Sequence, residues 1–156
     1  MTIEHMTSSW VTPVAQLEKD CFRDPWSEKS IAGELDNPLS LWLVAVDGGR
    51  LLGYVGSQTA LDETDMMNIA VAKEERRRGV ARALILELVN QLAQQGSRSL
   101  TLEVRASNQG AIALYQSLGF VQTGRRPNLT VWWLMRIMDR FGLKIRFRKD
   151  SALLIC

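Results

Sequence analysis

Residues 67–81 read MNIAVAKEERRRGVA, in which a strand-like apolar run is followed by basic residues, a glycine and the start of an apolar helix. Backbone N–H groups at a helix N-terminus point outward, and the helix dipole there favours negative charge. Arg76, Arg77 and Arg78 add positive charge, and Gly79 lets an anion approach the backbone closely. This order of strand, basic turn and helix therefore predicts a phosphate-binding site.

The helical pattern continues after Gly79, and a second strand follows it. Apolar residues recur at spacings of three and four from Val80 to Leu92, and Gly96 is the expected end of the helix. Residues 99–105 alternate between apolar and polar side chains, which is typical of a strand with one buried face. The centre of the chain is therefore predicted to be a strand–helix–strand unit.

Shorter elements are predicted before this unit. Residues 2–6 are expected to form a first strand. Thr12 is predicted to cap the next helix, with Pro13 as its first helical residue. Ser27 is predicted to cap another helix that ends at about Leu35.

A hairpin precedes the central unit and a short helix follows it. The sequence DGGR at residues 47–50 predicts the turn of a hairpin between the apolar runs 41–46 and 51–59. Asn108 is predicted to cap a helix that ends at Gly119, with a further strand after it. Since no repeat or linker interrupts the chain, we expect one α+β domain over residues 1–156.

Composition narrows the class of protein. The chain has 156 residues, of which 46% are hydrophobic and 23% are charged, as in an ordinary globular domain. Apolar runs are all shorter than the ~20 residues that a membrane helix needs. The first residues lack a basic region followed by an apolar one, so we expect no secretory signal and a cytoplasmic protein without membrane association.

Cysteine and histidine are too few for several kinds of site. The chain has two cysteines and one histidine, His5, whereas a structural zinc site needs four such ligands at short spacings. A histidine-based catalytic triad is equally unexpected because His5 lies next to the N-terminus. We therefore expect no metal, and we expect a carboxylate as any general base.

Charge is distributed unevenly along the chain. The net charge is +2, but residues 125–149 contain eight Lys and Arg against one Asp, which leaves the remainder acidic. An acidic body would attract a basic peptide substrate. The alternative is that the basic segment is simply a solvated tail.

Two side chains in the second half suit acid–base chemistry. Glu103 lies in the middle of the predicted strand 99–105, between apolar residues that belong to its other face. Tyr115 follows twelve residues later on the predicted helix. Taken alone, Glu103 could equally form an ion pair with Arg105 that has no catalytic role. Tyr115 could equally be an ordinary residue of the hydrophobic core.

Together these motifs resemble the GCN5-related N-acetyltransferase (GNAT) superfamily. The resemblance covers about residues 2–128. Within the superfamily it is strongest to the bacterial enzymes that acetylate the N-terminal alanine of a small-subunit ribosomal protein. The matching segments are PWSE at 25–28, NIAV at 68–71, RRRGVA at 76–81, LEVRASN at 102–108 and AIALY at 111–115.

The resemblance implies a fold and a co-substrate. The GNAT fold has a mixed, mostly antiparallel twisted sheet of about six to seven strands, flanked by about four helices. The donor in this family is acetyl-CoA, with a strand edge for the pantetheine arm and the basic turn for the pyrophosphate. By resemblance, the cofactor-binding residues are Ile69, Ala70, Val71, Arg77, Arg78, Gly79, Val80, Ala81, Arg82 and Asn108.

The resemblance also implies a mechanism. Glu103 would be the general base for the incoming ammonium, and Tyr115 would protonate the departing thiolate. Direct attack in a ternary complex is expected, without an acyl-enzyme. An α-amino group, with a pKa of ~7.7–8.0, loses its proton more easily than lysine at ~10.4, which slightly favours N-terminal chemistry.

The acceptor implied by the resemblance is the N-terminal peptide of a basic ribosomal protein, without direct binding to nucleic acid. Two alternatives remain open at the level of sequence. The chain could be a GNAT that acetylates lysine or a small amine. It could also be a CoA-binding module whose catalysis is impaired.

The resemblance ends in residues 129–148, a divergent C-terminal segment that lacks the tyrosine pair of the related enzymes. Apolar spacing predicts a helix over 134–141, and alternation predicts a strand over 143–147. Three interpretations remain open for the segment. It could be a hairpin over the acceptor site, a surface for a partner or oligomer, or out-of-frame sequence that packs poorly.

Overall fold

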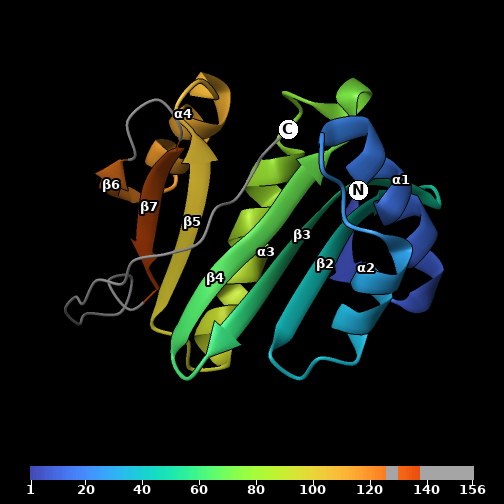
Figure 1. Cartoon of the computed structure of the whole chain (residues 1–156), viewed down its shortest axis with the longest axis horizontal. Helices are drawn as coiled ribbons and strands as arrows, with labels where there is room; N and C mark the ends of the chain where they lie inside the picture. The colour runs from blue at the N-terminus through green and yellow to red at the C-terminus, as the bar shows by residue number, and fades with distance from the viewer. Residues whose placement is uncertain (126–129, 138–156) are drawn as a thin grey trace.

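One twisted sheet of seven strands runs through residues 1–125 and 130–137, the part of the chain that a computed structural model describes (Figure 1). Its spatial order is β1-β2-β3-β4-β5-β7-β6. The strands are β1 (Thr2–His5), β2 (Ser40–Asp47), β3 (Arg50–Ala60), β4 (Glu63–Val71), β5 (Ser99–Arg105), β6 (Val121–Arg125) and β7 (Thr130–Arg136).

Four α-helices lie on the two faces of this sheet within the described residues, as the resemblance implies (Figure 1). They are α1 (Val11–Cys21), α2 (Glu28–Leu35), α3 (Val80–Gln94) and α4 (Gln109–Ser117), with short 3₁₀ turns at Ser8–Trp10 and Lys73–Glu75. The order β4–α3–β5 confirms the predicted strand–helix–strand unit. The α+β, GNAT-like architecture predicted from the sequence is therefore confirmed.

Strands β4 and β5 part soon after they begin. All other neighbours in the sheet are antiparallel, whereas β4 and β5 are parallel and pair only where 63–65 meet 99–101. Beyond that point the two strands diverge (Figure 1). The edge of β4 at Ile69–Val71 therefore has no strand partner on the β5 side among the described residues.

Two predicted helix caps are confirmed. The Ser27 hydroxyl accepts a hydrogen bond from the Ser30 backbone N–H at 3.1 Å, and α2 ends at Leu35 as expected. The Asn108 side chain accepts one from the Ala111 N–H at 3.1 Å at the start of α4. Short polar side chains at these positions satisfy N–H groups that the helix itself leaves unpaired.

The predicted hairpin is also confirmed. Gly48 and Gly49 connect β2 to β3 with φ angles of 54° and 77°. Positive φ at both central residues matches the twist of the strands that the turn joins, and only glycine adopts it without strain.

Two local predictions are wrong. Thr12 is not a cap, because the 3₁₀ turn Ser8–Trp10 leads directly into α1 and places Thr12 inside the helix. No helix begins at Leu134, because residues 130–136 form strand β7. That strand is paired on both sides, with β5 and β6, so tertiary hydrogen bonding overrides the local apolar spacing. The rest of the predicted helix and the strand predicted over 143–147 lie outside the described residues.

The two faces of the sheet are packed by different helices. One apolar cluster joins α3 and α4 to side chains such as Ile69, Leu102 and Val104. A second, smaller cluster joins α1 and α2 to the other face. Because side chains alternate along a strand, Glu103 points to the face opposite Leu102, the same face on which Asn68 meets α1.

Within the described residues, none of the helices combines the length and the apolar character needed to cross a membrane.

Candidate active site

The basic turn before α3 has the backbone shape of an anion site. Arg77 has a φ of 63° and Gly79 a φ of 83°, so two left-handed residues flank Arg78 just before the helix begins. Successive N–H groups in such a turn converge on a concavity that binds anions. For Arg77, which has a Cβ, this conformation costs about 1–2 kcal/mol. The turn is therefore held in a strained shape that suits a phosphate.

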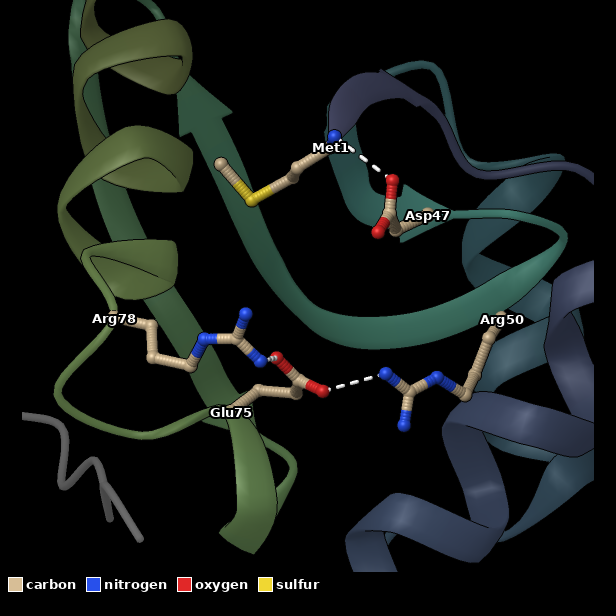
Figure 2. A network of polar contacts seen from close by, with 5 residues as sticks. All are labelled: Met1, Asp47, Arg50, Glu75 and Arg78. Atoms are coloured by element: carbon tan, nitrogen blue, oxygen red, sulfur yellow. Dashed lines mark hydrogen bonds and ion pairs between the residues drawn. The ribbon is translucent and has the colours of Figure 1, made fainter.

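A buried carboxylate beneath this turn was missed by sequence reasoning. The Glu75 side chain is 5% exposed and binds Arg78 and Arg50, each at 2.6 Å (Figure 2). It thereby ties the basic turn to the β2–β3 hairpin, 25 residues earlier in the chain. The spacing of three residues between Glu75 and Arg78 could have suggested an ion pair between them. The sequence around Glu75 gives no indication of its second partner, Arg50.

Arg76 in the turn and Arg82 in the first turn of α3 have separate contacts. Arg76 donates from Nε to the Val71 carbonyl at 3.3 Å, at the end of β4. Arg82 donates to the Ser117 hydroxyl at 3.1 Å and so links α3 to α4. Val80 is buried in the α3 cluster and Ala81 packs against it, so these two residues can meet a ligand only through their backbone N–H groups.

The divergence of β4 from β5 exposes the expected pantetheine edge. Ile69, Ala70 and Val71 bury their side chains and pair with β3 on one side. Their other edge faces the widening space between the strands. An amide-containing chain that lies along this edge would hydrogen-bond as an added strand does.

Tyr115 and Glu103 approach this region from opposite faces of β5. Tyr115 is fully buried in the α3 cluster against the Phe120 ring, and its hydroxyl has no hydrogen-bond partner among the described residues. Burial raises the pKa of Tyr115 above its usual range, so the phenol is neutral and can donate a proton. Glu103 is also buried, at 1% exposure, on the other face.

Glu18 on α1 is a second buried carboxylate that the sequence did not single out. One of its oxygens accepts hydrogen bonds from the Tyr54 hydroxyl and the Asn68 amide, and the other accepts the Trp26 backbone N–H at 3.0 Å. Burial raises the pKa of Glu18 to about 7, although the bonds from Trp26 and Asn68 act in the opposite direction. The four residues span 50 positions, so no local pattern could have revealed the network.

Neither carboxylate belongs to a metal cluster: in the described part of the chain, no three His, Cys, Asp or Glu side chains are placed to hold a metal ion.

A sheet that opens between β4 and β5, followed by a basic turn at the start of α3, is the architecture that the resemblance to acetyltransferases implies. The chain belongs to the acetyltransferase (GNAT) family, whose sequence profile matches residues 11–120.

Among individual proteins, the chain is 40% identical over 128 residues to the [ribosomal protein bS18]-alanine N-acetyltransferase of Salmonella typhimurium, covering 81% of this chain and 85% of the relative. The crystal structure of the ribosomal-protein-S18-alanine N-acetyltransferase from Escherichia coli is similar with a TM-score of 0.78 and 31% identity. That match covers 87% of this chain and 93% of the other.

A more distant structure shares the fold alone. NAA60 from Arabidopsis thaliana, solved in complex with acetyl-CoA, has a TM-score of 0.77 at 20% identity, with 87% of this chain and 98% of the other covered.

Proposed function

We propose that this protein transfers the acetyl group of acetyl-CoA to the N-terminal alanine of a small-subunit ribosomal protein. The main support is the edge of β4 at Ile69–Val71, which has no strand partner on the β5 side among residues 1–125 and 130–137 and leads directly into the strained basic turn before α3. An edge for amide groups next to a nest for phosphates suits the two parts of coenzyme A. We place the reaction in the cytoplasm, where ribosomal proteins are made.

The residues expected to hold the cofactor fit this assignment in different ways. Ile69, Ala70 and Val71 would bind the pantetheine arm through their backbone. In the turn 77–82, the backbone N–H groups would bind the pyrophosphate, with the arginine side chains adding positive charge. Asn108 would contribute from the start of α4, although its side-chain oxygen also caps that helix.

In the proposed reaction the acceptor nitrogen attacks the acetyl carbonyl carbon, a C–N bond forms and the C–S bond breaks. Glu103 takes the proton that the ammonium loses before the attack, directly or through a water. The nitrogen loses a second proton as the amide forms, and this proton balances the one that Tyr115 gives up. Tyr115 gives its proton to the leaving thiolate. Its hydroxyl is buried, neutral and without a hydrogen-bond partner in the described part of the chain, which supports this role. The two groups lie on opposite faces of β5, so base and acid can act on the two sides of the transferred acetyl group.

The choice of acceptor rests on the relatives. The Salmonella and Escherichia coli proteins are both named for the N-terminal alanine of ribosomal protein S18. An acidic chain outside residues 125–149 is consistent with a basic ribosomal substrate. The divergent segment 129–148 is the part of the chain that could alter this choice.

The proposal is tested by incubating the protein with acetyl-CoA and synthetic peptides, followed by mass spectrometry. The substrate is a basic peptide that begins with alanine. One control is the same peptide with its N-terminus blocked, and a second is a blocked peptide that contains lysine. We expect acetylation of the free N-terminus alone.

Acetylation of lysine alone would overturn the proposal in favour of a lysine or small-amine acetyltransferase. Binding of acetyl-CoA in calorimetry without transfer to any peptide would favour a CoA-binding module instead.

A further inference from the structure

Glu18 is buried but has no part in the reaction described above. Its side chain is fully enclosed among the apolar residues of the α1 cluster, such as Val14 and Ile31. Burying a carboxylate away from water is unfavourable even where hydrogen bonds compensate for part of the cost. Stability alone is therefore a poor explanation for this residue.

One oxygen of Glu18 holds β4 at the point where the strand changes direction. The β3–β4 register pairs Ser57 with Met66 but Gly56 with Asn68, which leaves Met67 as the extra residue of a bulge. Such a bulge re-aims the strand that contains it. Asn68, the residue directly after the bulge, donates to Glu18 and lies three residues beyond Asp65, where the pairing of β4 with β5 ends.

The other oxygen holds the connection between α1 and α2. It accepts the Trp26 backbone N–H, and the Trp26 ring lies 5.6 Å from Trp42, which itself stacks on Tyr54 at 5.6 Å. Arg23, Asp24 and Pro25 of the same connection are exposed. Glu18 thus links an exposed connection to the bulge of β4 through one carboxylate.

This link lies on the face of the sheet to which Glu103 points. If Glu103 is the base, the acceptor amine must approach from that face. The helices on that face are α1 and α2, and the bond from Asn68 joins α1 to β4, the strand next to β5 in the sheet. Glu18 is bonded both to this connection, at Trp26, and to β4, at Asn68.

We propose that Glu18 is a positioning residue that holds the α1–α2 connection as a wall of the acceptor site, in fixed relation to the cofactor edge of β4. This inference rests on the acetyltransferase function proposed above. It predicts that the two oxygens of Glu18 have separable effects, one on the acceptor and one on the cofactor.

The Glu18→Gln variant tests the acceptor side. Glutamine keeps one oxygen for Tyr54 and Asn68 but presents an NH₂ group to the Trp26 N–H, and two donors cannot bond to each other. We expect the KM for the alanine peptide to rise at least fivefold, while the Kd for acetyl-CoA in calorimetry stays within twofold of wild type.

The Asn68→Ala variant tests the cofactor side. It removes the bond between Glu18 and the bulge but keeps the bond to Trp26. We expect the Kd for acetyl-CoA to rise at least threefold, with a smaller change in the KM for the peptide.

Val14→Ala is the matched control, because it removes buried atoms from the same helix without touching the network. It should lower the melting temperature but change neither constant by more than twofold. The inference is overturned if Glu18→Gln leaves the peptide KM within twofold of wild type, or if Val14→Ala shifts both constants as the polar variants do.

Failure of the proposed function looks different from failure of this inference. If the wild-type protein acetylates no peptide, the proposed function fails, whereas wild-type activity with an unaffected Glu18→Gln variant overturns only the inference. If Glu18→Gln does not fold, the test is the comparison of Asn68→Ala with Val14→Ala in their affinity for acetyl-CoA. Equal affinities overturn the inference, whereas a loss of affinity in Asn68→Ala alone supports it.

Discussion

The face of the sheet under α3 and the face under α1 and α2 are built from different chemistry. Under α3 the buried residues form a large, continuous apolar cluster that includes Leu84, Leu88 and Leu92. Under α1 the cluster is smaller and encloses the carboxylate of Glu18 with its polar partners. Glu103 is buried on this second face as well.

The difference places most of the apolar packing on the α3 face and the two buried carboxylates Glu18 and Glu103 on the other, although the proposed acid Tyr115 belongs to the α3 cluster. Apolar burial is the main favourable contribution to folding, and the α3 face supplies most of it. A buried carboxylate opposes folding unless its hydrogen bonds are satisfied, and on the α1 face Glu18 accepts bonds from Trp26, Tyr54 and Asn68. The basic turn lies directly before α3, so it is close to the apolar α3 face and also forms part of the proposed site. Substitutions on the two faces should therefore affect different measurements.

The largest expected effect is on catalysis, from Glu103→Gln. If Glu103 is the base, kcat should fall by roughly 10²- to 10⁴-fold, because the amide cannot accept the proton. The Kd for acetyl-CoA should change little. Steady-state kinetics with the alanine peptide and calorimetry with acetyl-CoA measure the two quantities.

Glu87→Gln on α3 is the matched control and should leave kcat unchanged, since the part-buried Glu87 accepts a hydrogen bond from Gln91 one turn along the same helix. A kcat for Glu103→Gln within threefold of wild type would remove Glu103 from the role of base.

The second effect is on stability, from Leu88→Ala on the α3 face. Leu88 is fully buried, so the lost contacts and the cavity should cost about 3 kcal/mol of unfolding free energy in a denaturant titration. The kcat of the folded variant should stay near wild type. An equal loss of kcat in Leu88→Ala and Glu103→Gln would end the distinction between the faces.

The third effect is a pH dependence of stability that comes from Glu18. The pKa of Glu18 rises from 4.5 to about 7 on folding, so between these values the native state binds more protons than the unfolded state. Its contribution to stability is therefore present below about pH 4.5 and is lost as the pH rises through about 7. Glutamine does not titrate in this pH range, so the Glu18→Gln variant should lack this pH dependence.

The measurement is the unfolding free energy of wild type and Glu18→Gln at pH 5 and pH 8. When the pH is raised from 5 to 8, the unfolding free energy of wild type should fall by about 2 kcal/mol relative to that of Glu18→Gln. A difference that stays constant with pH would show that Glu18 does not titrate in this range.

The smallest effect concerns the basic turn, from Gly79→Ala. Gly79 has a φ of 83° and open space where a Cβ would lie, so alanine adds backbone strain of about 1 kcal/mol without a clash. Relaxation of that strain should distort the turn and weaken acetyl-CoA binding severalfold in calorimetry.

Gly96→Ala is an unusually close control. Gly96 has a φ of 84°, equally open space, and a position just after the other end of α3. Both variants should lose similar stability, but only Gly79→Ala should lose affinity for acetyl-CoA. Equal affinities in the two variants would argue against a phosphate site in the turn.

Sequence alone was sufficient for the elements that depend on local rules. The caps at Ser27 and Asn108, the Gly48–Gly49 turn and the basic turn before α3 depend on neighbours within a few residues. The period of apolar residues also predicted α3 correctly. Resemblance then assigned roles to Glu103 and Tyr115, which remain proposals.

Only the tertiary structure decided which distant residues meet. The bond between Glu18 and Asn68 joins positions 50 apart, and that between Glu75 and Arg50 joins positions 25 apart, so neither leaves a trace in local spacing. Strand β7 likewise exists because β5 and β6 pair with it, against its own helical spacing. The basic turn could be recognised from the sequence because its backbone makes the site. The acceptor wall depends on long-range hydrogen bonds in the core, which become visible only in the folded chain.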